Sequence, residues 1–292
     1  MSEQRLKRES MTVEESGGHR YIGTFDLRDG LRSLVLGIAW VLQVACAGIP
    51  QERQTGFLDR VIQIDGAAQR YQVYVPSNYD PDIQWPVILF LHGAGERGSD
   101  GLRQTDVGLG SAIRRYSERY PAIVVFPQAP EDSPWPGPPA TAAIAALDRT
   151  LQEFSVDRGR IYLTGFSMGG QGGWYLAYTY PTRFAAVVVV CGFLSAGEQF
   201  PSFVSPDSPA PTSVVAERLQ KLPIWVYHGD ADPIVPVAAS REIVESLRQL
   251  GATVQYTELP GVGHNSWDAA YRSPELPVWL FNQRKPSYLA PP

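Results

Sequence analysis

Residues 161–170 read IYLTGFSMGG. The apolar run at 161–164 is typical of a buried strand, and the glycines at 169 and 170 open a segment of helical composition. Between them lies Gly-x-Ser-x-Gly, centred on Ser167. In such a strand–turn–helix the serine backbone is strained, and only glycine two residues to either side leaves room for it. The stretch therefore predicts a sharp turn that lifts the Ser167 hydroxyl above a sheet.

Outward from this turn, short apolar runs alternate with segments of helical pattern. Runs rich in β-branched residues are typical of parallel strands buried on both faces, whereas the first two segments alternate apolar and polar residues around Gly66 and predict an antiparallel hairpin. The expected strands are residues 58–65, 70–76, 86–91, 122–126, 161–164, 184–190, 223–227 and 253–259. The expected helices are residues 111–119, 141–154, 169–180, 213–222, 238–250 and 274–283. This order predicts an α/β fold with a doubly wound, mostly parallel sheet.

The composition limits the class of protein. With 292 residues, 44% of them hydrophobic, the chain is long enough for one sizeable core. The formal net charge of -5 leaves no basic excess to neutralise phosphates, which argues against nucleic acid as a partner. Residues 57–285 are expected to form one domain without a large lid, since the Ser- and Pro-rich residues 194–211 predict only a short excursion over the sheet.

The N-terminus carries a separate pattern. Residues 1–30 form a polar, charged extension, and residues 31–48 combine Arg32, a short apolar run and the small residues Ala45 and Ala47. A basic flank, an apolar stretch and a small-x-small site are typical of a secretory signal, and the stretch is shorter than the roughly 20 apolar residues of a membrane span. We therefore expect export to the periplasm or medium. Lipid anchoring at Cys46, against which Gln43 argues, and a cytoplasmic protein with an amphipathic N-terminal helix are the alternatives.

Two later loops offer the partners that a nucleophilic serine requires. Residues 228–236 (HGDADPIVP) directly follow a buried strand, and residues 261–265 (GVGHN) follow the next one. Because the carboxyl ends of parallel strands meet at one edge of a sheet, both loops are expected beside Ser167. A serine nucleophile needs a base to take its proton and an acid to hold the tautomer of that base. We predict Ser167 as the nucleophile, His264 as the base and Asp232 as the acid.

Two residues close to Asp232 in the sequence, Asp230 and His228, could also have a role in the site. Asp230 is the rival for the acid role, and we favour it instead as a brace or cap of the loop. His228 precedes the loop at the strand end and is expected to be structural.

The oxyanion of an acyl-transfer intermediate needs two backbone donors. One is expected from Met168, the residue after the nucleophile, and the other from the loop after the third strand, residues 91–98 (LHGAGERG). The glycines of this loop let the backbone approach a substrate closely, and we assign the second donor to the N–H of Ala94. His92 is expected to brace the loop.

No metal site and no cofactor are predicted. The two cysteines, Cys46 and Cys191, lie outside any C-x-x-C or Cys/His ligand spacing, and the four histidines are far apart in the sequence.

Taken together, these motifs resemble those of the carboxylesterase branch of the α/β-hydrolases, which includes the phospholipase/carboxylesterase-like and polyhydroxybutyrate-depolymerase-like esterases. The motifs are residues 92–100 (HGAGERGSD), 165–170 (GFSMGG), 263–267 (GHNSW) and the Asp232 loop, which fits H-G-x-x-D-x-x-V-P. The resemblance spans residues 57–285 and implies an α/β-hydrolase fold with a serine esterase activity. It does not fix a substrate, because function depends on the site and not on the fold.

Two tryptophans are candidate substrate contacts. Trp135, in the Pro-rich residues 130–139, could stack on an aromatic acyl group such as a feruloyl unit, or it could simply pin its loop as a packed side chain. Trp267, three residues past the predicted base, could line the pocket or pack the His264 loop.

The leading hypothesis is hydrolysis of small-molecule or polymer carboxylic esters through an acyl-enzyme, with short-chain, aryl or feruloyl-type substrates. A serine peptidase of the prolyl-oligopeptidase type and a polyester depolymerase are the enzymatic alternatives; no segment of the sequence reads as the gating propeller that the former would carry. A catalytically silent surface binding protein is the alternative from another class.

Overall fold

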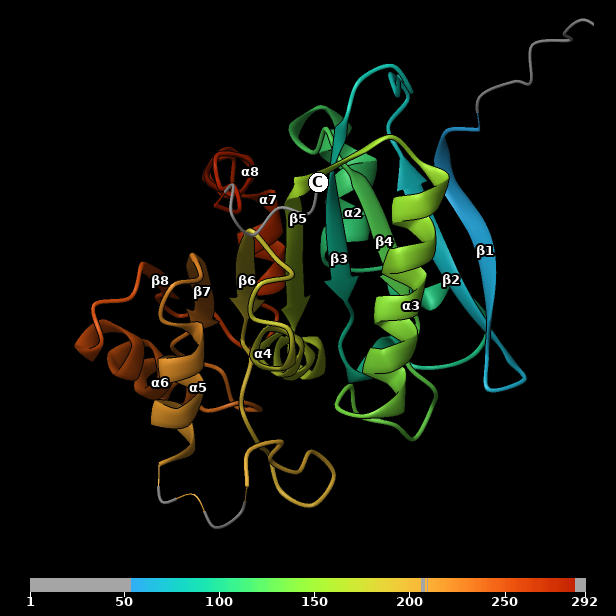
Figure 1. The fold of residues 1–292 in the computed structure, drawn as a ribbon. Helices are drawn as coiled ribbons and strands as arrows, with labels where there is room; N and C mark the ends of the chain where they lie inside the picture. The colour runs from blue at the N-terminus through green and yellow to red at the C-terminus, as the bar shows by residue number, and fades with distance from the viewer. Residues whose placement is uncertain (1–53, 206–207, 209, 287–292) are drawn as a thin grey trace, which may run out of the picture. The chain divides into compact units, whose positions relative to one another are not determined.

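The computed structural model describes residues 54–205, 208 and 210–286 (Figure 1). The predicted N-terminal extension (1–30) and the signal or anchor segment (31–48), with Cys46, lie outside the described residues. Of the helices that are described, none combines the length and the apolar character needed to cross a bilayer.

A single sheet of eight strands organises the described residues, in the order β1-β2-β4-β3-β5-β6-β7-β8. The strands are β1 (Gly56–Ile64), β2 (Ala67–Val75), β3 (Trp85–Leu91), β4 (Ile123–Pro127), β5 (Val156–Phe166), β6 (Ala186–Val190), β7 (Ile224–Gly229) and β8 (Val254–Leu259). β1 pairs antiparallel with β2, and β2 with β4, whereas all later neighbours run parallel. The predicted N-terminal hairpin and the mostly parallel sheet are confirmed.

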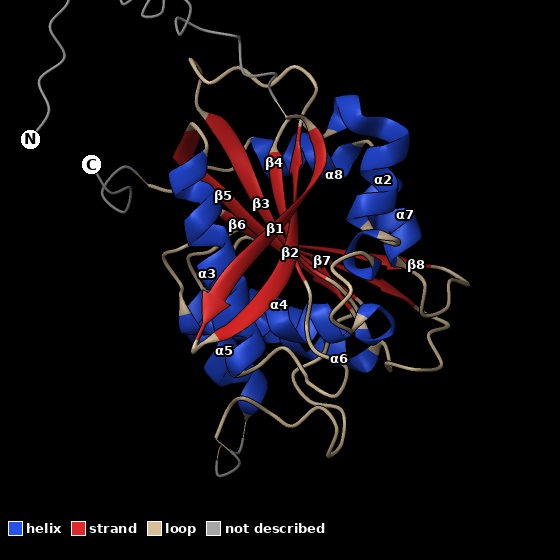
Figure 2. Cartoon of the chain, turned by 90° about the vertical axis from the view of Figure 1, so that its right-hand side faces the viewer, coloured by secondary structure: helices blue, strands red, loops and turns tan. Residues whose placement is uncertain are grey.

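Helices cover both faces of this sheet (Figures 1 and 2). The described helices are α2 (Leu109–Tyr116), α3 (Pro138–Glu153), α4 (Met168–Thr179), α5 (Pro211–Leu219), α6 (Ala238–Gln249), α7 (Trp267–Arg272) and α8 (Glu275–Phe281). α3, α4, α5 and α6 bury apolar side chains in one core, and α2, α7 and α8 in a second core on the other face. The strands between them are buried on both sides, which is why their sequences are continuous apolar runs.

The structure differs from the predicted elements at three places. β5 begins at Val156, earlier than expected, because its charged first residues are paired: Asp157 accepts hydrogen bonds from Arg160 (2.8 Å) and Arg284 (2.7 Å). Residues 117–119 form a short 3-10 helix instead of the last turn of α2. α7 was not predicted, since six residues are too few for a helical period to show in the sequence.

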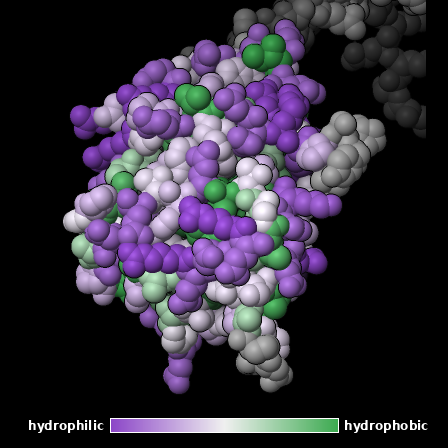
Figure 3. All heavy atoms as spheres, turned by 90° about the vertical axis from the view of Figure 1, so that its left-hand side faces the viewer, coloured by the Kyte–Doolittle hydropathy of each residue, from purple (hydrophilic) through white to green (hydrophobic). Residues whose placement is uncertain are grey.

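Polar residues also protect the far edge of the sheet. Figure 3 shows the side on which α6 and β8 lie, where hydrophilic residues predominate. Arg241 of α6 donates to Glu258 of β8 at 2.9 Å. Charged side chains on an edge strand discourage pairing with a second chain.

The strand order creates the place where a ligand can bind. From β3 the chain passes to β4 on one side, and only afterwards to β5 on the other side. The loops after β3 and β5 therefore leave the sheet in opposite directions. In open α/β sheets the crevice at such a switch point, outside the carboxyl ends of the strands, is the usual ligand site.

α4 packs against β3 more closely than a side chain would permit. A Cβ atom on Gly169 would lie 2.0 Å from the Leu91 carbonyl oxygen, and one on Gly165 would lie 2.2 Å from the Gly169 carbonyl oxygen. Real Cβ atoms essentially never come this close. The glycines of residues 165–170 thus allow the helix to start directly on the strand, as the sequence predicts.

We expect Gly169→Ala to destabilise the protein by about 3 kcal/mol, because the new methyl group collides with backbone and not with a movable side chain. That corresponds to a melting temperature roughly 6 to 12 °C lower in a protein of this size, measured by thermal unfolding. Gly173→Ala on the same helix is the matched control, since its Cβ meets nothing closer than 3.7 Å. Equal melting temperatures for the two variants would contradict the account.

Candidate active site

Ser167 occupies the turn between β5 and α4 in a backbone conformation that is unfavourable for any residue but glycine. Its φ is 53° and its ψ is -120°. The Ser167 N–H donates to the Val190 carbonyl (2.9 Å), and its own carbonyl accepts from the Gln171 N–H (3.1 Å). Strain of this kind costs on the order of 1–3 kcal/mol and persists only where the surroundings over-determine it. Here both peptide groups of the turn are held.

Ser167, His264 and Asp232 lie in one hydrogen-bonded row. His264 Nε2 is 2.9 Å from Ser167 Oγ, and His264 Nδ1 is 2.8 Å from Asp232 Oδ2. Because a carboxylate only accepts, Nδ1 carries the proton and Nε2 presents its lone pair to the hydroxyl. The Asp232 side chain is fully buried, while 19% of the His264 side chain is exposed. The three residues, far apart in the sequence, thus meet at the carboxyl edge of the sheet.

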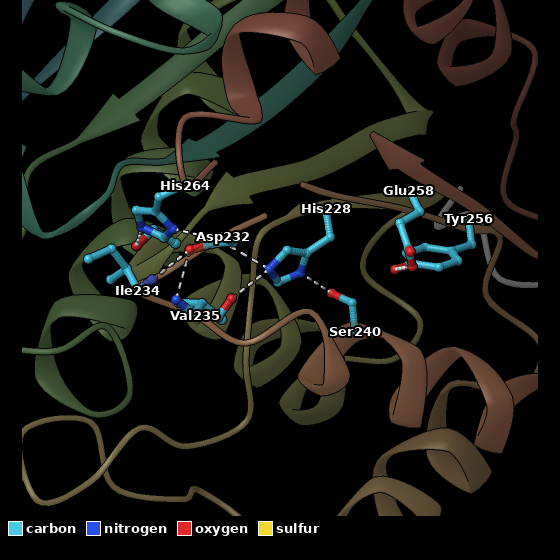
Figure 4. Close-up of polar contacts among 9 residues, drawn as sticks. His228, Asp232, Ile234, Val235, Ser240, Tyr256, Glu258 and His264 are labelled. Carbon is cyan, nitrogen blue, oxygen red and sulfur yellow. Dashed lines mark hydrogen bonds and ion pairs between the residues drawn. The ribbon is translucent and has the colours of Figure 1, made fainter. Parts of the chain in front are cut away.

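Asp232 is held as an anion despite its burial. Burial by itself raises the pKa of this carboxyl, but the hydrogen bond from His264 and those from the Val235 and Ile234 N–H groups outweigh it, so that the pKa lies below its usual range. Both N–H groups donate to Oδ1 at 2.9 Å. Figure 4 shows these contacts. The loop after β7 therefore supplies a preformed cradle for the charge.

Asp230 has a different set of contacts. Its N–H donates to the Leu259 carbonyl (3.1 Å), and its Oδ1 accepts from the Gly261 N–H (2.6 Å). These bonds tie the loop after β7 to the loop after β8, which carries His264. The structure thus brings Asp232, and not Asp230, to the histidine.

The loop after β3 faces Ser167 across the crevice. Gly93, Ala94, Gly95 and Glu96 line the cavity there. Ala94 is the first residue of a 3-10 helix, η1 (Ala94–Glu96), and Met168 is the first residue of α4. The first N–H groups of a helix have no partner inside it, so both are available as hydrogen-bond donors. Of the two predicted oxyanion donors, Ala94 lies in the cavity wall and Met168 follows Ser167 directly.

His92 braces this loop, as its sequence position suggests. Its Nε2 accepts from the Ala129 N–H (2.9 Å), so Nδ1 carries the proton and donates to the Gly93 carbonyl (2.6 Å). Burial lowers the pKa of His92 to about 4, which keeps the ring neutral.

The predicted substrate contact at Trp135 is wrong. Trp135 is fully buried, its Nε1 donates to the His92 carbonyl (2.9 Å), and its ring packs edge-on against the His92 ring. It does not line the cavity around Ser167. The competing interpretation, a packed tryptophan that pins its loop, is the correct one, because the indole fits under the loop after β3 and not over the crevice.

Trp267 does line the cavity, which has a volume of about 470 Å³. The centroid of its ring lies 4.5 Å from that of Phe166 and 5.4 Å from that of His264, and its plane is perpendicular to the His264 ring. Phe193 and Phe200, whose ring centroids lie 5.5 Å apart, also line the cavity. Four aromatic side chains thus share the cavity with the nucleophile.

Sequence reasoning did not single out Phe193, Phe200 or Ile234 as pocket residues. Phe193 and Phe200 belong to the excursion after β6, and Ile234, with 68% of its surface exposed, lies in the Asp232 loop. The position of both segments after neighbouring parallel strands was a usable indication. Nothing in the sequence says which of their side chains turn inward.

The side chains near Ser167 that could bind a metal ion are poorly suited to do so. In the part of the chain that the structure describes, the candidate metal-ligand group is Cys191, Asp232 and His264, whose ligand atoms lie within 4.8 Å of one another. Asp232 and His264 are already hydrogen-bonded to each other. Burial raises the pKa of the Cys191 thiol to about 12, so a metal ion would have to displace the proton of a buried thiol in order to bind there.

Comparison with known proteins gives the class. The family model described as phospholipase/carboxylesterase matches residues 138–273. A solved structure described as a thermostable esterase is similar with a TM-score of 0.68 and 33% identity, covering 78% of this chain and 63% of that one. The fold is therefore that of the α/β-hydrolases.

Two curated relatives align with most of this chain. The feruloyl esterase B of Thermothelomyces thermophilus is 25% identical over 264 residues, which are 80% of this chain and 85% of that protein. An uncharacterized secreted protein of Arthroderma benhamiae is 25% identical over 243 residues, 74% of this chain but 25% of that protein. The chain spans between a quarter and about two fifths of the length of the first curated relatives that it matches. The proteins to which the chain is similar are thus esterases and thioesterases of the carboxylesterase branch of the α/β-hydrolases.

Substitutions of the two tryptophans should have different effects when two substrates are compared. We expect Trp267→Leu to lower kcat/KM for methyl ferulate relative to p-nitrophenyl acetate by roughly three- to tenfold, the value of an aromatic contact. Trp135→Phe should instead lower the melting temperature, because it removes a buried hydrogen bond worth about 1 kcal/mol and leaves a space, without changing that ratio. A change of the ratio in Trp135→Phe as large as in Trp267→Leu would contradict the assignment.

Proposed function

We propose that the protein is a serine carboxylesterase that hydrolyses short-chain, aryl or feruloyl-type esters through an acyl-enzyme. The observation that carries the proposal is the row of hydrogen bonds from Ser167 through His264 to Asp232. Such a row lets a neutral serine act as a nucleophile near neutral pH, since the base is within reach of the proton and its tautomer is fixed.

In the proposed reaction, Ser167 Oγ attacks the ester carbonyl carbon while His264 Nε2 takes the hydroxyl proton. The carbonyl oxygen becomes an oxyanion, which the N–H groups of Ala94 and Met168 stabilise. As the C–O bond to the alcohol breaks, His264 returns the proton to the leaving oxygen. A water molecule, deprotonated by the same nitrogen, then attacks the acyl carbon; as the bond to Ser167 Oγ breaks, His264 returns this proton to Oγ, which releases the acid and restores the Ser167 hydroxyl. Asp232 remains ionised and stabilises the imidazolium in both halves.

The aromatic walls support an aryl or feruloyl-type acyl group. The Phe166–Trp267 pair and the Phe193–Phe200 pair line the same cavity as the nucleophile, and planar aromatic groups gain from contacts with such rings. The similarity to a feruloyl esterase points the same way.

The first test is turnover of p-nitrophenyl acetate, butyrate and octanoate and of methyl ferulate. Ser167→Ala should abolish turnover and labelling by a fluorophosphonate. Asp232→Asn should lower kcat on the order of 10⁴-fold, because an amide cannot hold the same histidine tautomer. Asp230→Asn is the matched control and should retain most of the activity.

Several outcomes would count against the proposal. A folded parent that is inert on all four esters and resists the fluorophosphonate would favour a silent binding protein. Cleavage of peptide amides in preference to aryl esters would favour the peptidase alternative, and release of soluble acids from a polyester film in preference to small esters would favour the depolymerase.

We also propose that the chain is exported. The supporting observations are the basic flank, apolar run and small residues of 31–48 and the similarity to a secreted protein. The full chain produced in a bacterial host should appear in the periplasm or medium with a new N-terminus after Ala45 or Ala47, read by N-terminal sequencing. Lipid attachment at Cys46 would instead leave the product in the membrane fraction, released by Cys46→Ala. Retention of Met1 in the cytoplasm would contradict export.

A further inference from the structure

Asp232 is contacted by a second histidine on the side away from His264. His228 lies in β7, and its Nε2 is 3.2 Å from Asp232 Oδ2, the same oxygen that accepts from His264 Nδ1 at 2.8 Å. Figure 4 shows the two rings on opposite sides of the carboxylate. The side chains of His228 and Asp232 are both fully buried. Water therefore does not compete for this contact.

The surroundings of the His228 ring fix its tautomer. Nε2 faces two groups that can only accept, Asp232 Oδ2 and the Val235 carbonyl oxygen, the latter at 3.0 Å. Nε2 must therefore carry the proton. Nδ1 lies 2.7 Å from Ser240 Oγ and accepts the proton of that hydroxyl. Ser240, at the start of α6, is itself buried. The Ser240 hydroxyl thus sets the tautomer of His228, whose Nε2–H is shared between the Val235 carbonyl (3.0 Å) and Asp232 Oδ2 (3.2 Å).

His228 acts in this chain as a neutral donor. Burial lowers the pKa of its ring, although the Val235 carbonyl and Asp232 oppose the shift. The titratable groups that face it are Asp232, His264 and, on the neighbouring strand β8, Glu258. Glu258 is occupied by hydrogen bonds from Arg241 and Tyr256, which lower its pKa to about 2. Its charge is thus balanced outside the site.

With His228 in place, every acceptor position of Asp232 is used. Oδ1 accepts from the N–H groups of Ile234 and Val235, and Oδ2 accepts from His264 and lies 3.2 Å from His228 Nε2, whose N–H it shares with the Val235 carbonyl. A carboxylate has about four acceptor sites. Loss of His228 would leave one of them empty in a place without water, and the plane of the carboxylate would then be held on one side only.

We propose that His228 is a positioning residue: its Nε2–H, set by Ser240, holds Asp232 Oδ2 in the orientation that His264 requires. This inference rests on the proposed function. The distinction from mere packing is that the donated hydrogen bond, and not the volume of the ring, carries the effect.

The test compares His228→Met, which keeps much of the volume but has no donor, with His228→Gln, whose amide N–H₂ can reach Asp232. In His228→Met we expect kcat/KM for p-nitrophenyl acetate to fall roughly 10- to 100-fold, the value of a hydrogen bond to a charged group. Since a misplaced carboxylate stabilises the imidazolium less, the acid limb of kcat/KM should move to lower pH. His228→Gln should recover most of both losses.

A second readout does not need turnover. The proton on His264 Nδ1 should give a downfield ¹H NMR resonance in the parent, and it should move upfield in His228→Met because the bond to Asp232 weakens. Ser240→Ala should change the resonance, kcat/KM and the pH profile in the same direction but by a smaller amount. Thr150→Val is the matched control: its buried hydroxyl donates to the Ala146 carbonyl (2.9 Å) in α3, so its loss should lower stability alone.

The outcomes separate the two proposals. If the parent turns over no ester, the proposed function fails, while the resonance still tests the position of Asp232. A folded His228→Met with the parental resonance and pH profile overturns the inference. The inference is also overturned if His228→Met retains activity while the resonance moves downfield and the acid limb moves to higher pH. In that case His228 would only compete with His264 for Asp232 Oδ2. If His228→Met does not fold, a parental resonance and pH profile in Ser240→Ala overturn it instead.

Discussion

The arrangement of the site depends on the contact between α4 and the end of β3. The Gly169 Cα lies against the carbonyl groups of Leu91 and His92, where no Cβ would fit. This contact fixes the height of Ser167 above the sheet and at the same time fixes the loop that begins at Gly93. The nucleophile and one proposed oxyanion donor are therefore set by the same backbone contact. Packing density of this kind transmits small displacements, so the two cannot move independently.

A second constraint is the burial of a negative charge. Taking Asp232 out of water is unfavourable unless hydrogen bonds replace hydration. The loop after β7 supplies two N–H groups from Ile234 and Val235, His264 donates a third hydrogen bond, and His228 Nε2 lies 3.2 Å from Oδ2. The fixed donors make the charge stable in the folded state without a paired cation. A paired arginine would draw the carboxylate away from His264, whereas neutral donors leave its charge free to stabilise an imidazolium.

The sequence was most informative where geometry requires one residue type. Glycine at 165 and 169, and the order of Ser167, Asp232 and His264 after three strands of one sheet, predicted the turn and the meeting of the three side chains. It was least informative where orientation depends on distant packing. Trp135 and Trp267 both lie in segments that follow strands at the carboxyl edge of the sheet. Trp135 nevertheless packs under the loop of His92, whereas Trp267 lines the cavity. His228 was expected to be structural from its place at the strand end, and no local pattern shows that its Nε2 lies 3.2 Å from Asp232 Oδ2.

The relative placement of the catalytic candidates follows from the backbone of the sheet. The residue after β5, Ser167, donates its N–H to Val190 at the end of β6. The residue after β6, Cys191, donates to Tyr227 of β7, and the residue after β7, Asp230, donates to Leu259 at the end of β8. Among the described non-glycine residues, φ is positive at Asp65, Ser167 and Cys191. Two of these are thus held at neighbouring strand ends by the continued ladder. Each loop starts from a fixed position at the carboxyl edge of the sheet, so Ser167, Asp232 and His264 need only short segments of chain to meet.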